Sequence, residues 1–350
     1  MDIIRFIKDW TLPVAMGTGA VLYLVFAFTP QLDEAATAME PFFATILPLF
    51  MFLILFVTFC KVDFRQLRPV AWHGWVLLFQ TLFVGIIMAV ILVPSSSFLA
   101  PPSSSLVPPS SFLVPPSSSL VPPSSFLVPP SSKILMEALL MCIISPCATA
   151  AAVVTQKLGG SLEQTTTYTF LSNFLTVLLA PVCFPLIEKG ADITFWAAFT
   201  KILHEVFLVL VVPMFLAYIV KHYIKPLHRR IVSVRDLSYY LWACSLMIVT
   251  GTTVKNIVHA QVSVWLLSAI ALLGLVICIV QFAVGRFIGH YFDHTQEAGQ
   301  ALGQKNTAFA IWLSSAYLNP LSSVGPGCYI LWQNIVNSVE IWQYRKKAGS

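Results

Sequence analysis

Charged side chains are scarce in this chain. Asp, Glu, Lys and Arg make up 10% of its 350 residues, whereas hydrophobic residues make up 57%. A soluble domain carries about 25% charged residues, so this composition excludes an ordinary soluble globular protein. The mean hydropathy of +0.82 indicates a polytopic membrane protein instead. The net charge of +5 does not indicate nucleic acid, because membrane proteins keep excess Lys and Arg in cytoplasmic loops.

Metal-binding and catalytic patterns are also missing. The seven cysteines are scattered through apolar segments without a CxxC pair, and no His/Cys cluster has metal-ligand spacing. We therefore expect no metal centre and no cofactor. Acidic residues fall mostly in loops or at span ends, and the one acid-base pair inside a span, His204 and Glu205, lacks a third partner. An enzyme is accordingly not expected.

Long apolar runs are abundant. A helix that crosses a bilayer needs about 20 mostly apolar residues, and we predict an all-α fold with ten such spans. They cover residues 11–28, 41–60, 70–93, 134–157, 163–187, 194–220, 237–258, 262–290, 299–318 and 324–344.

Positive charge predicts the orientation of these spans. With the N-terminus inside, most Lys and Arg fall in cytoplasmic segments. The opposite side keeps only Lys133, Lys189 and Lys255, together with an acidic loop over Asp33–Glu40. We therefore expect a multi-pass protein of an inner or plasma membrane, in contact with lipid, with both termini cytoplasmic. We expect it to be a monomer.

Residues 94–132 are expected to form a disordered loop outside the membrane. From Pro101 to Ser132 the chain repeats PPSSSLV or PPSSFLV. A proline pair every seven residues removes backbone donors and prevents a continuous helix. Unpaired backbone groups cost several kcal/mol each in hydrocarbon, so the repeat is placed between the third and fourth spans.

Two spans have polar, small-residue centres. One reads "IISPCATAAAVVTQKLGG", and the other reads "ALGQKNTAFAIWL", with Gln304, Lys305 and Asn306 in its middle. Each is the fourth span of a five-span half, which is typical of an inverted repeat. In such transporters interrupted helices meet near the midplane, where free N–H groups bind anions and free carbonyls bind cations.

The chain resembles the bile acid:sodium symporter family. Five stretches carry the resemblance in order: "FVTFCKVDF", "LLFQTLF", "PCATAAAVVT", "ALGQKN" and "GCYILWQNIVNS". The resemblance implies a panel domain of spans 1, 2, 6 and 7 (residues 1–60 and 191–258). It also implies a core domain of spans 3–5 and 8–10 (residues 70–93, 133–190 and 262–344), in which helices four and nine cross, and a cytoplasmic tail over 345–350.

The resemblance implies a secondary transporter of organic anions that works by alternating access. The substrate would be a bile acid or a smaller keto or hydroxy acid. Four residues match substrate-facing positions of the family: Thr149, Asn306, Asn334 and Gln333, the last where a histidine is common. Three residues match sodium-binding positions: Gln80, Thr165 and Thr169.

The remaining sodium ligands are absent. Ala151 and Ala152 stand in place of the family Ser-Asn pair, Ala301 in place of its glutamate and Lys305 in place of its glutamine. Sodium requires hard oxygen ligands, which alanine side chains do not provide, and a lysine charge repels the ion. Ordinary two-sodium coupling is therefore in doubt, and sodium and a proton stay open as alternative coupling ions.

Lys305 suggests what takes the place of the bound sodium ion. An ammonium carries one positive charge and three donors, so it could occupy a cation position and tie the ninth helix to Gln80 and to free carbonyls. It could be a fixed strut or a group that exchanges a proton during transport; a side chain that reaches lipid is the third possibility. Other open alternatives are an uncoupled carrier, an arsenite-type exporter that uses Cys147, a membrane enzyme and a receptor.

Overall fold

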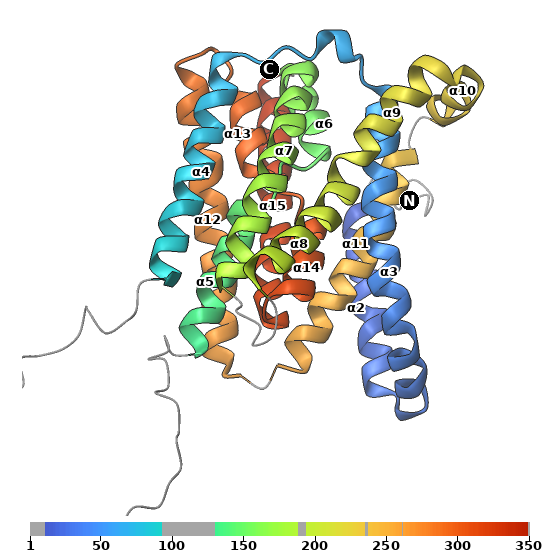
Figure 1. Cartoon of the computed structure of the whole chain (residues 1–350), viewed down its shortest axis with the longest axis vertical. Coiled ribbons are helices and arrows are strands. Elements are labelled where there is room, and N and C mark those ends of the chain that lie inside the picture. Colours follow the sequence, from blue (N-terminus) through green and yellow to red (C-terminus); the bar gives the residue numbers. More distant parts are fainter. Residues whose placement is uncertain (1–10, 93–129, 188–193, 235–236, 261, 349–350) are drawn as a thin grey trace, which may run out of the picture.

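The described part of the chain is helical. The computed structural model describes residues 11–92, 130–187, 194–234, 237–260 and 262–348, and within them it has helices and one isolated bridge but no strand (Figure 1). Five helical stretches there are long and apolar enough to cross a membrane: Ala71–Leu92, Leu162–Ile187, Phe195–Tyr223, Tyr240–Val258 and Val264–His290. The prediction of an all-α polytopic membrane protein is confirmed at this level.

The helices follow the predicted spans closely, with several subdivisions. They are α2 (Thr11–Phe28), α3 (Pro30–Lys61), η1 (Phe64–Gln66), α4 (Ala71–Leu92), α5 (Pro130–Ile144), α6 (Ala150–Lys157), α7 (Leu162–Ile187), α8 (Phe195–Leu210), α9 (Val212–Tyr223), α10 (Lys225–Ser233), α11 (Leu237–Val258), α12 (Val264–His290), α13 (Thr295–Gly303), α14 (Thr307–Tyr317), η3 (Pro320–Ser323) and α15 (Val324–Ala348). The sixth span is divided between α8 and α9 at Val211, two residues before Pro213, which cannot donate to the helix ladder.

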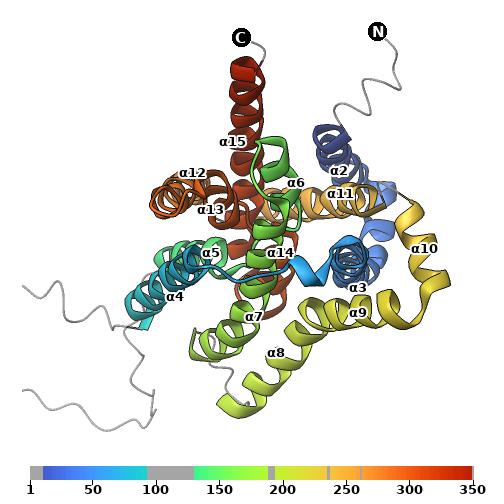
Figure 2. The same ribbon diagram turned by 90° about the horizontal axis from the view of Figure 1, so that it is seen from above.

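Helices that are distant in sequence pack together in two groups. In one group α11 packs against α2 and α3, and α9 also packs against α3. In the other group α12 packs against α5, α13 and α15, and α4 packs against α5. Seen from above, α2, α3, α9 and α11 lie apart from α4, α5 and α12, with α14 between the two groups (Figure 2).

Two expected loops differ from the structure. The acidic segment Asp33–Glu40 is not a loop but lies within α3, which begins at Pro30. Its alanines favour a helix, and proline is well tolerated in a helical first turn. Residues 130–132, expected in the loop, form the start of α5. The rest of the expected loop, residues 94–129, lies outside the described residues.

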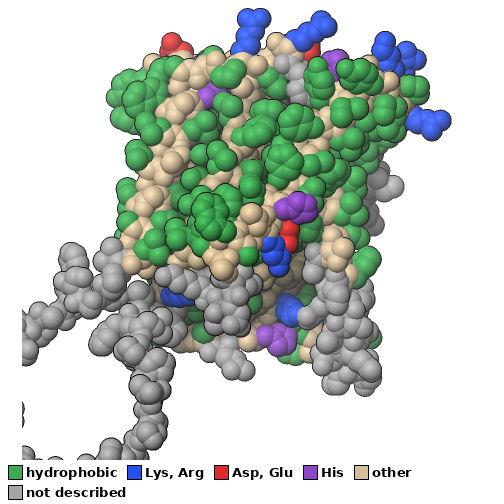
Figure 3. Space-filling view, viewed as in Figure 1, with side chains coloured by type: hydrophobic (Ala, Val, Ile, Leu, Met, Phe, Trp, Pro, Cys, Tyr) green, Lys and Arg blue, Asp and Glu red, His purple; other side chains and the backbone are tan. Residues whose placement is uncertain are grey.

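Hydrophobic side chains cover most of one broad face of the molecule, while several Lys and Arg side chains project from the end that carries α10 (Figure 3). We call this the α10 end and the other the opposite end. α10 itself was not expected as a helix; none of its residues is buried.

Candidate functional site

The two segments with polar centres are both interrupted, and their interruptions pair. The first helix stops at Ile144 and resumes at Ala150; the second stops at Gly303 and resumes at Thr307. The Ala148 amide donates to the Gln304 carbonyl at 2.9 Å, and the Asn306 amide donates to the Pro146 carbonyl at 2.8 Å. The two non-helical stretches therefore form an antiparallel crossing, with an isolated bridge between Cys147 and Lys305.

The C-terminal end of α5 meets side-chain donors at this crossing. A helix leaves its last four carbonyls without partners inside the helix. Gln281 Nε2 donates to the Cys142 carbonyl at 3.1 Å, and Thr176 Oγ1 donates to the Ile144 carbonyl at 2.9 Å. Gln80 Nε2 donates to the Ile143 and Ser145 carbonyls at 3.0 and 3.3 Å. The helix end thus receives side-chain donors from α4, α7 and α12.

Lys305 completes this set of donors with a charge. Its side chain is 1% exposed, and its Nζ donates to the Ile143 carbonyl at 3.2 Å. Among the residues that the structure describes, no carboxylate lies within 4.0 Å of Nζ. Its backbone amide donates to Gln333 Oε1 at 2.9 Å, which fixes where the side chain begins. The ammonium therefore lies at the negative end of the α5 dipole.

Apolar packing replaces part of the expected ion site. Ala151 and Ala301 are fully buried in one cluster with Trp72 and Tyr168, and Ala152 is 7% exposed. Tyr168 turns its hydroxyl to Gln80 Oε1, at 3.1 Å. Alanine side chains in such a cluster offer no oxygen to a cation.

The two threonines matched to ion ligands have protein partners. Thr165 Oγ1 donates to the Ser161 carbonyl and lies 3.2 Å from Thr155 Oγ1. Thr169 Oγ1 donates to the Thr165 carbonyl at 3.0 Å and contacts Cys147 Sγ at 3.4 Å. Both hydroxyls are therefore engaged within the protein.

A cleft lies beside the crossing, between the two helix groups. The starts of α6 and α14 form one wall, with Thr149 and Asn306 as the residues that precede each helix. The opposite wall belongs to α3 and α11; Lys305 and Gln333 also line the cleft. In this conformation it holds about 30 Å³ of space that water could occupy, which is room for about two water molecules. Since helix N-termini bind anions, this wall suits a carboxylate.

Gln304 belongs to a buried chain of polar side chains on the side of α13 that faces away from the cleft. Its Nε2 donates to Gln300 Oε1 and, at 3.1 Å, to Asn337 Oδ1. Gln300 Nε2 donates to Glu340 Oε2 at 2.7 Å, and Glu340 forms an ion pair with Arg286. This chain joins α12, α13 and α15.

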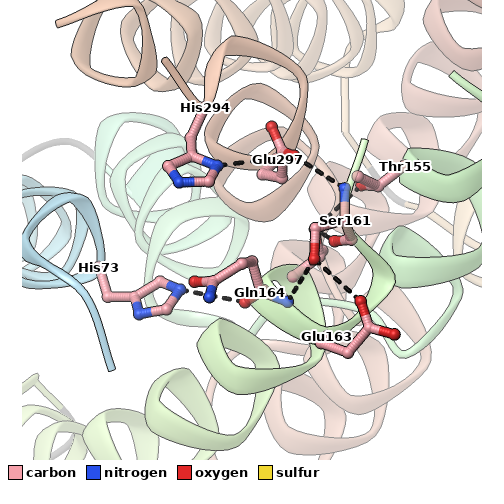
Figure 4. A network of polar contacts seen from close by, with 8 residues as sticks. His73, Thr155, Ser161, Glu163, Gln164, His294 and Glu297 are labelled. Atoms are coloured by element: carbon pink, nitrogen blue, oxygen red, sulfur yellow. Dashed lines mark hydrogen bonds and ion pairs between the residues drawn. The ribbon is translucent and has the colours of Figure 1, made fainter. Parts of the chain in front are cut away.

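A second polar network holds α13 to the turn between α6 and α7 (Figure 4). Glu297 Oε1 accepts the Ser161 amide at 2.7 Å and lies 3.6 Å from His294 Nδ1. From α4, His73 contacts the Gln164 carbonyl at 3.0 Å through Nε2. The turn itself needs glycine, because Gly159 has φ +80°. The network fixes the half-helices around the crossing from the α10 end.

The structure brings most, though not all, of the candidate residues together. Gln80, Thr149, Lys305, Asn306 and Gln333 meet at the crossing or its cleft. Gln304 faces the polar chain, and Asn334 does not line the cleft. Neither does Cys147, the residue on which the arsenite alternative depends.

Sequence reasoning missed two donors to α5. Gln281 carried a signal that could have revealed it, since a glutamine stands alone in the apolar span 262–290 and polar residues inside membranes usually have partners. Thr176 gave no such signal, because threonines in helices commonly bond to their own backbone.

Residues 48–288 match the Sodium Bile acid symporter family. A search of the curated proteins finds no match for the chain. The matched segment runs from α3 to the end of α12 and thus contains the first interruption, while the second interruption, with Lys305, follows it.

Proposed function

The chain belongs to the sodium bile acid symporter family, a family of membrane transporters, and we propose that it is a sodium-independent secondary transporter of small organic anions. In this proposal the ammonium of Lys305 takes the place of a bound sodium ion. The substrate carboxylate binds in the cleft at the starts of α6 and α14.

The contact between Lys305 Nζ and the Ile143 carbonyl carries the proposal. A half-helix that ends inside the membrane presents free carbonyls and the negative end of its dipole, which suits a cation. Here a covalently attached cation lies at that place, so no ion has to bind before the crossing is neutralised. The buried alanines 151 and 301 agree with this, because they supply no ligand oxygen.

The starts of α6 and α14 support an anionic substrate. The starts of both helices line the cleft, and negative charge is stabilised at a helix N-terminus. Asn306 Oδ1 already accepts the Phe309 amide at 3.2 Å, so the α6 start, whose Thr149 makes no side-chain cap, has more amides available. The substrate carboxylate is therefore expected to lie nearer Thr149 than Asn306.

The two helix groups suit alternating access. The group of α2, α3, α9 and α11 falls within the expected panel, and the group of α4, α5, α12, α13 and α15 falls within the expected core, which supports this division. The paired interruptions at 145–149 and 304–306 fall at equivalent places in the two halves, as in an inverted repeat of ten spans. The Lys and Arg residues at the α10 end support a cytoplasmic location for that end.

Proton coupling is the second candidate. One observation favours it: within the described residues Lys305 has no carboxylate partner within 4.0 Å. A buried cation without a counter-charge is costly, so an exchange of its proton during the cycle is a natural second use of this side chain.

Counterflow tests the proposed function. Purified protein is placed in vesicles loaded with unlabelled 2-oxoisovalerate, and entry of the labelled acid is followed. Saturable entry that requires the protein and is inhibited by other small carboxylates is the expected result. Absence of such entry for every small carboxylate tried would overturn the proposal.

A further inference from the structure

Ser245 of α11 has an unused hydroxyl at the cleft. The residue is 0% exposed, and its Oγ has no hydrogen-bond partner among the described residues. Two other hydroxyls of the same helix bond back to it: Thr252 Oγ1 to the Ile248 carbonyl at 3.0 Å and Thr253 Oγ1 to the Val249 carbonyl at 2.9 Å. Thr250 Oγ1 is also without a partner, but Thr250 does not line the cleft, whereas Ser245 does.

An unpaired buried hydroxyl destabilises a protein unless something else pairs with it. Ser245 belongs to the cleft wall opposite the starts of α6 and α14. A molecule held at those helix starts by its carboxylate would therefore have Ser245 across the cleft from it. The hydroxyl is available to donate to an oxygen of such a molecule.

We propose that Ser245 is a specificity-determining residue that donates a hydrogen bond to a second oxygen of the substrate, on the carbon next to the carboxylate. In this role Ser245 distinguishes 2-oxo and 2-hydroxy acids from acids that lack this second oxygen. This inference rests on the proposed function, because it takes the transported anion to bind at the α6 and α14 starts. It adds what the helix starts do not provide, namely a reason to distinguish one small carboxylate from another.

The cleft residues of α3 indicate what the non-polar part of the substrate is. Met51, Ile54 and Leu55 of α3 are all less than 10% exposed and line the cleft beside Ser245. These side chains offer only apolar contact, which suits a short alkyl group.

Two acids that differ by one oxygen test the inference. Counterflow of labelled 2-oxoisovalerate and of labelled isovalerate is measured in vesicles containing wild-type protein or Ser245→Ala. Wild type is expected to prefer the 2-oxo acid by about tenfold in KM, the size of one hydrogen bond. Ser245→Ala is expected to transport both acids with equal KM, while its KM for isovalerate stays unchanged.

Ser314→Ala is the matched control. Ser314 is equally buried, but its hydroxyl donates to the Ile311 carbonyl at 3.1 Å and the residue does not line the cleft. This variant is expected to keep the preference for the 2-oxo acid. A Ser245→Ala protein that also keeps it would overturn the assignment of Ser245.

The outcomes separate this inference from the function on which it rests. Transport of both acids by wild type with equal KM would refute the role of Ser245 and leave organic-anion transport standing. Transport of neither acid by wild type would refute both.

Discussion

Lys305 and Gln80 donate to one acceptor, the carbonyl of Ile143. Lys305 Nζ lies 3.2 Å and Gln80 Nε2 lies 3.0 Å from that oxygen. Lys305 belongs to the second interruption and Gln80 to α4. The Ile143 carbonyl at the end of α5 therefore joins three segments that are distant in sequence. Because one donor is charged and the other neutral, the two are not equivalent, and they can be tested separately.

Replacing Lys305 by Met is predicted to separate stability from transport. Methionine keeps most of the side-chain volume, and Gln80 still pairs with the Ile143 carbonyl. A buried charge without a carboxylate partner is costly to keep out of water, so the thermal midpoint of the purified protein is expected to stay equal or rise. Counterflow is expected to fall at least tenfold, because the crossing loses the cation that neutralises the α5 end.

Lys201→Met is the control for this prediction. Lys201 is an exposed residue of α8, far in sequence from either interruption. Its replacement is expected to change neither the thermal midpoint nor counterflow. Full transport by Lys305→Met would mean that the charge at the crossing has no part in the cycle.

A clasp at the opposite end joins the two helix groups. Asn256 Nδ2 of α11 donates to Ser323 Oγ at 2.7 Å and to the Pro320 carbonyl at 3.3 Å. The η3 turn that offers these acceptors is anchored by Glu137 Oε2, a fully buried carboxylate that accepts from Ser322 Oγ at 2.6 Å. Asn256 lies eleven residues beyond Ser245, or about 16 Å along the helix. The clasp therefore holds α11 to η3 at a distance from the cleft toward the opposite end.

Cross-linking across the clasp is predicted to stop transport. In Asn256→Cys/Ser323→Cys, with the exposed Cys244 replaced by Ser, a short bifunctional thiol reagent is expected to join α11 to η3. Counterflow is then expected to fall at least tenfold, because alternating access requires these elements to separate. The measurement is counterflow before and after treatment.

The two variants that carry only one of the introduced cysteines serve as controls for the cross-link. Each is expected to react with the reagent at one end only and to retain transport. Unimpaired counterflow by protein that gel analysis shows to be fully cross-linked would exclude an opening at this clasp.

Local sequence predicted the interruptions better than it predicted their partners. Pro146 and the polar run Gln304–Asn306 both mark where a helix in a membrane cannot continue, and both places are interrupted. The sequence also predicted that the Lys305 side chain would reach backbone carbonyls at the crossing, since a lysine in the middle of a span needs such partners. Its acceptor, Ile143, could not be identified, because it depends on how two distant segments cross.

Two other features could not be predicted from sequence, because they depend on how distant segments pack. Asp33–Glu40 was expected as a loop because of its charge, yet helix propensity continues α3 through it. Ser245 is indistinguishable in sequence from other helical serines. Only the packing of α11 shows that Ser245 lines the cleft and that its hydroxyl has no partner among the described residues.

The most direct test of the central claim is the sodium dependence of transport. Counterflow of 2-oxoisovalerate by wild-type protein is measured at one pH in sodium chloride, potassium chloride and choline chloride of equal concentration. If the Lys305 ammonium stands in for the bound ion, the three rates agree within about twofold, since a fixed cation needs no ion from solution. A rate that rises and saturates with sodium, and that is lost in potassium and choline, would contradict the account.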